Sequence, residues 1–337
     1  MIRVFMASGE ELIAAPVEEL GDVRTLKTRL AGLCSVPRFR QKLLCLSDGT
    51  SLADWSTLDE PMDLQLVLLP FNYASSEQAS ELINMASSGR DSEVEEILQG
   101  RLHPDIAYNG GETALFFASR KGLVSTVKLL LEANAATDRV SRSNRAGPAL
   151  NVACFAGHAG VTQLLLEYRA EVPKVPGRAE LPLNLACFKG SAEVVQLLLD
   201  AKADKDASGQ QGFTPLLEAC SRGNVSVVRL LLESRANVDK VCCSDDVSYG
   251  ETPLYVAARS GHVEVVRLLL QARADTEKIC GMQGVTALDI ARRKSRMRTW
   301  FLLLEASTRK NELAGSWLKL MRSFLAELLS GWRAKRL

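Results

Sequence analysis

The sequence predicts a mainly α-helical protein: a solenoid of helix-turn-helix units, with a small α+β domain before it and an amphipathic helix after it. Two observations indicate the solenoid. The triplet Leu-Leu-Leu begins at positions 129, 164, 197, 230, 268 and 302, and an alanine keeps the same rhythm at positions 118, 153, 186, 219, 257 and 291. Two independent features that share one period of 33 to 38 residues are typical of a repeat architecture.

The composition is that of a globular chain. Of 337 residues, 47% are hydrophobic and 24% are charged, and the formal net charge of +1 gives no case for nucleic acid. No apolar run approaches the roughly 18–20 residues that span a bilayer, and no signal peptide is evident. Eight cysteines without a regular framework favour free thiols in a reducing compartment. We therefore expect a cytoplasmic protein, with the nucleus as the alternative.

Residues 1–71 do not repeat, and their elements follow in a recognisable order. The segment MIRVFMASGEELIAAPVEEL predicts two strands around a Ser-Gly turn. Asp22 is placed as an N-cap, and Val23, Leu26 and Leu30 share one face of the helix expected after it. The segments RQKLLCL and LQLVLLPF predict further strands, with SDGTSL as a turn. A hairpin, a helix and then more strands describe a β-grasp domain.

This order and spacing resemble ubiquitin-like domains. In that family a strand pair presents an apolar patch beside a basic residue, so the resemblance places Leu44 and Val67 in the patch and Lys42 beside it. The apolar residue of the family's first hairpin is missing, because ASGEE stands there, and no Gly-Gly follows LLPFNY. The resemblance implies contact with ubiquitin-system components, for which the missing hairpin residue is a departure, and the absence of Gly-Gly predicts that the domain is not a conjugated modifier. A plain docking or capping domain is the alternative, and residues 72–79 are expected to form a linker.

Each repeated unit carries the signals of two short helices. The segments GFTPLLEACSRG and GETPLYVAARSG place Thr at an N-cap and Pro at the first helical position. The segment VEVVRLLLQ predicts the second helix, with apolar residues at i, i+3 and i+4. One helix pair cannot bury its apolar face alone, so the units must stack. The first helix is expected to end at Gly122, Gly157, Gly190, Gly223 and Gly261.

These motifs resemble ankyrin repeats, on the evidence of the TPL…A helix start, SGHVEVVRLLL and RADTEK. The resemblance covers residues 80–306, as a degenerate first unit and six clear ones, and it implies β-hairpin tips. In the family a histidine after TPL ties the helix start to the neighbouring repeat; other residues stand at that position here, so the sequence gives no support for those hydrogen bonds. The family's glycine after the second helix is also replaced, and the residues there are expected to be left-handed at a cost of about 1 kcal/mol each. They are Asn134, Arg169, Lys202, Arg235 and Arg273.

Three cysteines share one position in successive units, at Cys154, Cys187 and Cys220. Stacked helices lie about 8–10 Å apart, too far for a disulfide, and no histidine or acid recurs beside these cysteines to complete a metal site. Ser119 and Ala258 fill the same position elsewhere, which favours a small packing residue. The adjacent Cys242–Cys243 pair lies in an inserted loop, and we expect ordinary loop thiols there, with redox sensitivity as the alternative.

Catalytic chemistry finds no support in the sequence. The chain has three histidines, and no nucleophile with its base, no phosphate-binding loop and no metal-ligand spacing is evident. We therefore predict a non-enzymatic protein without a cofactor or a bound metal.

The ankyrin resemblance implies a concave binding face, lined by the two positions that follow the cysteine position and by the hairpin tips. Aromatic and arginine residues in the middle of a surface are typical of binding hot spots, and basic rows attract an acidic segment. Interleaved glutamates (Glu112, Glu180 and Glu251) disfavour nucleic acid. Alternatively, the basic residues only solubilise and the aromatics pack under a neighbour. The partner-binding candidates are Arg120, Lys121, Phe155, Phe188, Lys189, Phe213, Arg222, Tyr249, Arg259 and Arg293.

Residues 307–337 form a separate segment with an apolar stripe at helical spacing and mainly basic residues beside it. A basic amphipathic helix suggests calmodulin or a membrane surface as its partner. The alternative is an extra cap on the last repeat. Its expected anchors are Trp317, Leu320, Phe324 and Leu329.

Taken together, these patterns predict a protein–protein interaction adaptor that binds a partner on the concave face of its repeats. Two alternatives remain open: a substrate receptor or shuttle in the ubiquitin system, and a scaffold that associates with calmodulin or a membrane through its C-terminal helix.

Overall fold

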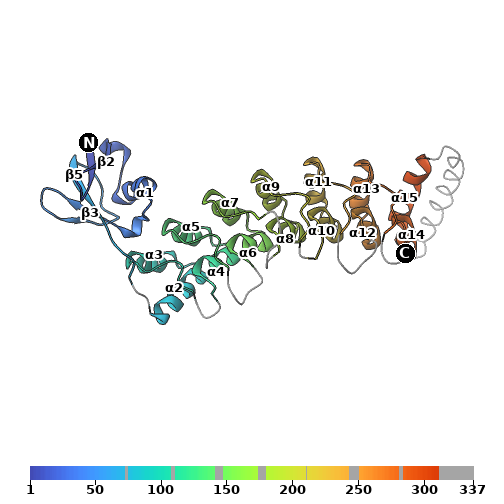
Figure 1. The fold of residues 1–337 in the computed structure, drawn as a ribbon, viewed down its shortest axis with the longest axis horizontal. Coiled ribbons are helices and arrows are strands. Elements are labelled where there is room, and N and C mark those ends of the chain that lie inside the picture. Colours follow the sequence, from blue (N-terminus) through green and yellow to red (C-terminus); the bar gives the residue numbers. More distant parts are fainter. Residues whose placement is uncertain are drawn as a thin grey trace, which may run out of the picture. The chain divides into compact units, whose positions relative to one another are not determined.

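The computed structural model describes residues 1–72, 75–107, 111–140, 147–173, 180–209, 211–242, 250–280 and 284–310. The chain divides into two compact units, Met1–Glu171 and Val172–Leu337, each described below by itself. Among the described residues, the first unit holds a small sheet with helix α1 and three helix pairs, and the second holds four helix pairs. Figure 1 labels these helices. Over the described ranges, no helix has both the length and the apolar character needed to cross a bilayer.

The first unit begins with a five-stranded mixed sheet in the order β2-β1-β5-β3-β4. β1 pairs with β5 in parallel, and the other pairs are antiparallel. Helix α1 (Val23–Cys34) packs on this sheet over a core that includes Val4, Leu26 and Leu64. This arrangement is compatible with the expected β-grasp, to which it adds the short strand β4. The strands are β1 Ile2–Met6, β2 Glu11–Ala15, β3 Gln41–Cys45, β4 Ser51–Leu52 and β5 Met62–Leu68.

Three helix pairs complete the first unit. The first helices of the pairs pack on one another in sequence, and so do the second helices. Helix α2 begins at Ser76, inside the expected linker, because Ser75 and Gln78 form a capping box that satisfies the free N–H groups of its first turn. The pairs are α2 Ser76–Ser88 with α3 Asp91–Gln99, α4 Ala114–Lys121 with α5 Val124–Glu132, and α6 Ala149–Ala156 with α7 Ala159–Glu167.

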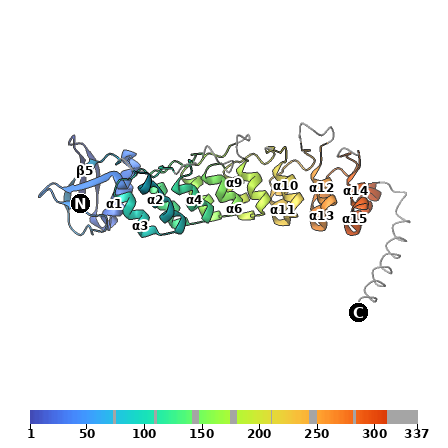
Figure 2. The same cartoon turned by 90° about the horizontal axis from the view of Figure 1, so that it is seen from below.

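The second unit repeats this design with four helix pairs in two stacked rows, seen from another side in Figure 2. Its last described helix runs to Lys310, and the four anchors expected in the C-terminal segment lie outside the described residues. The pairs are α8 Pro182–Lys189 with α9 Ala192–Asp200, α10 Pro215–Arg222 with α11 Val225–Glu233, α12 Pro253–Ser260 with α13 Val263–Gln271, and α14 Ala287–Arg293 with α15 Met297–Lys310.

The expected helix caps are present. In four pairs a threonine side chain accepts a hydrogen bond from the backbone N–H three residues later, at Thr113, Thr214, Thr252 and Thr286. All five expected glycines end their helices with positive φ.

Glycine is also required at these helix ends because the next repeat comes close. At Gly122 a Cβ atom would lie 2.6 Å from Nδ1 of His158, which belongs to the following pair. The same ring places Nε2 3.2 Å from the carbonyl oxygen of Arg120, forming a hydrogen bond between the repeats. His262 approaches Gly223 in the same way. These histidines are therefore links between repeats.

An aspartate ladder forms a second series of links. In each case an aspartate Oδ1 accepts a hydrogen bond from a backbone N–H of the next repeat, at 2.8 or 2.9 Å. The links join Asp105 to Ala136 and Asp138 to Glu171 in the first unit, and Asp206 to Asn237 and Asp239 to Asp275 in the second.

The five residues that replace the family's glycine after the second helix are left-handed, as predicted. Their φ values lie between 61° and 65°. At the position of the family's histidine, the structure supplies a hydrogen bond between repeats: Nδ2 of Asn184 donates to the carbonyl oxygen of Phe213 at 2.7 Å. An amide at this position can thus link two repeats.

The three repeated cysteines are free and fully buried, which confirms their packing role. Burial raises the pKa of the Cys154 thiol to about 12, and that of Cys187 well above its usual value. These thiols stay protonated at neutral pH. Cys242 is a free, half-buried thiol, and Cys243 lies outside the described residues.

Candidate functional site

In the second unit, a stacked aromatic–arginine pair lies at the ends of two neighbouring first helices. The guanidinium carbon of Arg222, at the end of α10, lies 3.7 Å from the centre of the Phe188 ring on α8. Phe188 is half-buried, whereas Arg222 and Lys189 are exposed. A guanidinium this close to the centre of a ring is attracted to the ring's face, and its N–H groups can still donate to a partner.

A partly buried carboxylate lies close to this pair. Burial raises the pKa of Glu218, the charge of nearby Arg222 opposes that rise, and the charge of Glu180 adds to it. The positive charge of Arg222 therefore faces Glu218 as well as the exterior. The sequence predicted a basic surface here, and the structure adds an acidic group within it.

The remaining candidates of the second unit differ in exposure. Arg259 is half-buried, forms an ion pair with Glu251 and lies 5.8 Å from the centre of the Tyr255 ring. Arg293 is exposed and Phe213 is half-buried, while Tyr249 lies outside the described residues.

In the first unit, the ends of the first helices carry Arg120, Lys121 and Phe155. Arg120 is exposed at the end of α4, and its guanidinium lies 5.1 Å from the centre of the Phe117 ring. Lys121 is also exposed. Phe155, at the end of α6, leaves 53% of its surface exposed. Each unit thus presents an arginine associated with an aromatic ring at the end of a first helix.

The three residues for which the sequence predicted a ubiquitin-like patch lie on the outer face of the sheet. Leu43 points into the core, so its neighbours Lys42 and Leu44 point to the opposite face. Lys42 is the register partner of Val67, and Leu44 is that of Gln65. Lys42 is exposed, and Leu44 and Val67 are half-buried.

A buried arginine that the sequence did not single out connects the sheet domain with the first repeats. Arg38 is 1% exposed and donates to three carboxylates: to Asp54 at 2.9 Å, to Glu95 on α3 at 2.8 Å and to Glu132 on α5 at 2.9 Å. Lys27 also bonds Asp54, at 2.6 Å. We call these five residues the Arg38 cluster. Because its members are far apart in the sequence, no local pattern could have indicated it.

The helix pairs and their links define the class of this protein, a helical repeat solenoid. Models of ankyrin repeats match residues 82–176, 171–242 and 216–270, which together make up more than half of the chain. The chain therefore belongs to the ankyrin-repeat family. Ankyrin repeats are protein–protein interaction modules, and this chain carries such a module.

Comparison with solved structures agrees with this assignment. The crystal structure of the human ASB11 ankyrin repeat domain matches with a TM-score of 0.59 and 29% sequence identity, over 66% of this chain and 96% of that one. No curated protein matches the sequence.

Proposed function

We propose that this protein is a non-enzymatic adaptor that binds an acidic segment of a partner protein at the ends of its first helices. The observation that carries the proposal is the Arg222–Phe188 pair, whose guanidinium is exposed and held in place by the ring 3.7 Å away. A pre-ordered arginine loses little conformational freedom when it pairs with a carboxylate. Arg120 with Phe117 offers a second pair of this kind.

Phe155 supports the apolar part of the proposal. A phenylalanine with 53% of its surface exposed gains from burial against a partner, in the way that aromatic anchors dominate protein interfaces. We assign Phe155 and Phe188 as anchors. Lys121, Lys189 and Arg259 are assigned as flanking positive charges that speed the encounter with an acidic partner.

The test is affinity capture with the full chain as bait, beside a variant that carries Phe155→Ser and Arg222→Glu. A control variant, Arg229→Glu, makes the same charge reversal at an exposed position within helix α11. We expect acidic partners that the parent and the control retain and the double variant loses, with thermal unfolding matched among the three. Capture of the same partner proteins by all three baits would contradict the proposal.

The outer face of the sheet favours a second function, contact with ubiquitin-system components. The supporting observation is the register that brings Lys42 and Val67 opposite each other, with Leu44 on the same face. The test is binding of the full chain to ligase and proteasome components, with Leu44→Ala expected to abolish it. The proposed contact of the C-terminal helix with calmodulin or a membrane rests on the sequence alone.

A further inference from the structure

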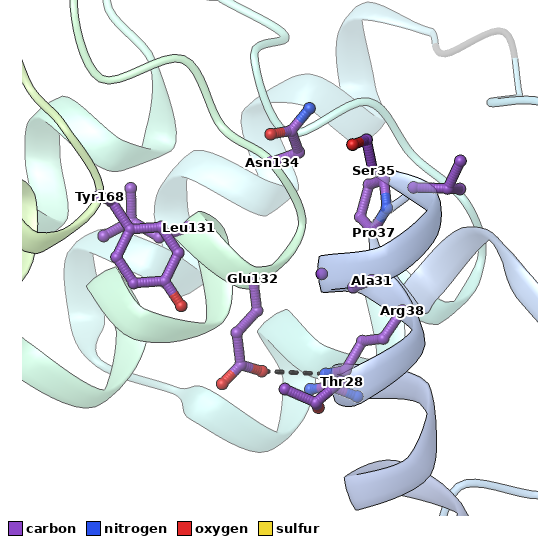
Figure 3. A pocket seen from close by; sticks show the side chains of 11 residues that line it. Thr28, Ala31, Ser35, Pro37, Arg38, Leu131, Glu132, Asn134 and Tyr168 are labelled. Atoms are coloured by element: carbon purple, nitrogen blue, oxygen red, sulfur yellow. Dashed lines mark hydrogen bonds and ion pairs between the residues drawn. The ribbon is translucent and has the colours of Figure 1, made fainter. Parts of the chain in front are cut away.

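A pocket of about 500 Å³ lies within the first unit, between the sheet domain and the repeats (Figure 3). On one side it is lined by the end of α1 and the segment after it, including Ala31 and Pro37. On the other side it is lined by Leu131 and Glu132 at the end of α5 and by Tyr168 after α7. The pocket therefore combines apolar walls with polar groups that include the carboxylate of Glu132 and the guanidinium of Arg38, and none of the residues assigned above to the acidic partner lines it.

Three helices end at this pocket. Ser35 caps α1, Asn134 follows the end of α5, and Tyr168 caps α7, and all three residues line the pocket. The last carbonyl groups of a helix carry a partial negative charge, so the end of each helix favours a cation within about one turn. The convergence of three such ends indicates a site with negative potential.

Glu132 adds a full negative charge. Its Oε2 accepts from Arg38, whereas none of the described residues donates a hydrogen bond to Oε1. Arg38 also lines the pocket and pairs with three carboxylates, but Lys27 pairs with Asp54 and Arg24 pairs with Glu95, whereas Arg38 is the one cation in the described ranges that pairs with Glu132. Burial, followed by the charges of Glu132 and Glu167, raises the pKa of the Tyr168 hydroxyl, which agrees with this negative potential. Figure 3 shows this hydroxyl pointing toward Glu132.

We propose that this pocket receives an arginine side chain from a peptide segment of a partner protein. The methylene stem packs against Ala31, Pro37 and Leu131. The planar guanidinium donates to Oε1 of Glu132 and stacks on the exposed ring of Tyr168. The occupant is a basic segment, because the carboxylate and the three helix ends all select for positive charge. This interaction goes beyond the proposed function, which uses other residues and an acidic partner.

The test is an NMR titration of the full chain, with labelled alanine and leucine methyl groups, using two small probes. Nα-acetyl-arginine methylamide carries the guanidinium, and Nα-acetyl-citrulline methylamide has nearly the same shape without the charge. We expect the arginine probe to shift the methyl signals of Ala31 and Leu131 with a Kd on the order of millimolar, as is usual for fragments of this size. The citrulline probe should bind at least about tenfold more weakly, because it forms no charge-assisted hydrogen bond.

Two variants assign the site. Tyr168→Ala should weaken the arginine probe several-fold, and Ala31→Leu should fill the pocket and abolish the shifts, with thermal unfolding near that of the parent in both. Equal binding of the two probes, shifts confined to other residues, or shifts that persist in Ala31→Leu would each overturn the proposal. If Ala31→Leu destabilises the chain, Tyr168→Ala alone decides, and unchanged binding by it overturns the proposal.

Discussion

Arg38 shows what a single side chain contributes to this protein. Burial by itself lowers the pKa of Arg38, but the hydrogen bonds that it donates to Glu95 and Glu132 outweigh that effect and raise the pKa above its ordinary value. The guanidinium therefore stays charged, and it is the counter-ion for carboxylates from a loop and two helices. Removing Arg38 would leave three largely buried carboxylates without the positive charge and the hydrogen bonds that it supplies.

We predict that Arg38→Met destabilises the chain by about 3–5 kcal/mol, the usual effect of breaking a buried ion pair. The matched control is Arg29→Met, because Arg29 is half-exposed and its ion pair, with Glu19, lies outside the Arg38 cluster. Exposed pairs contribute about 1 kcal/mol or less, so the control should change stability little. Urea unfolding followed by circular dichroism measures both. Equal losses in the two variants would show that the buried cluster has no special role.

The raised pKa of Glu218 should make the stability of the chain depend on pH. Its pKa is raised in the folded chain, mainly by burial, so the folded state binds this proton more tightly than the unfolded state does. Protonated Glu218 therefore adds to the free energy of unfolding. This contribution is complete below pH 4.5, the ordinary pKa of a glutamate, and is lost as the pH rises through the pKa of Glu218 in the folded chain. We expect Glu218→Gln to raise the Tm at pH 7 and to lose this advantage below pH 4.5. A difference in Tm that does not change with pH would contradict this account.

At the scale of the helix pair, local signals in the sequence were sufficient to predict much of the fold. The caps at Thr214 and Thr252, the glycine ends and the buried apolar rows were all predicted, because each depends on neighbours within one turn. What the sequence did not indicate are the links between repeats. The hydrogen bond from Asn184 to Phe213 requires the positions of two repeats, which no single repeat contains.

Replacing a left-handed residue after a second helix by glycine should stabilise the chain. Arg235 has a φ of 62°, a region that costs a side chain about 1 kcal/mol and costs glycine little. Arg235→Gly should therefore stabilise the chain by up to about 1 kcal/mol. Arg229→Gly, on an exposed site within helix α11, should destabilise by a similar amount. Thermal unfolding checks both, and a loss from Arg235→Gly would disprove the strain argument.

At the scale of the whole molecule, the sequence indicated a chain of two kinds of domain but not how the sheet domain attaches. Arg38 follows Pro37 in a basic stretch and has the pattern of a solvated surface charge. Its partners lie at positions 54, 95 and 132, so the cluster depends on tertiary structure alone. The pocket beside it was unpredictable for the same reason. In the candidate partner face, the exposure of Phe155 and the stacking of Arg222 also required the structure.

Removing the sheet domain should loosen the first repeats. A chain without residues 1–72 exposes Glu95 and Glu132, and it loses the ion pairs that hold α3 and α5 against Arg38. Repeat proteins transmit such changes mainly to their nearest neighbours. We therefore expect faster hydrogen exchange in α3 and α5, measured by mass spectrometry, and little change in α12 and α13. Unchanged exchange in α3 and α5 would mean that the sheet domain adds no support to the repeats.

The aspartate ladder has a consequence for how such a chain can change length during evolution. Each link needs one aspartate from one repeat and a backbone N–H from the next, as in the bond from Asp275 N–H to Asp239. Every residue except proline supplies that donor. A duplicated gene segment would therefore bring its own acceptor and find a donor already present in its new neighbour, so that repeats can be gained or lost without a matched second mutation.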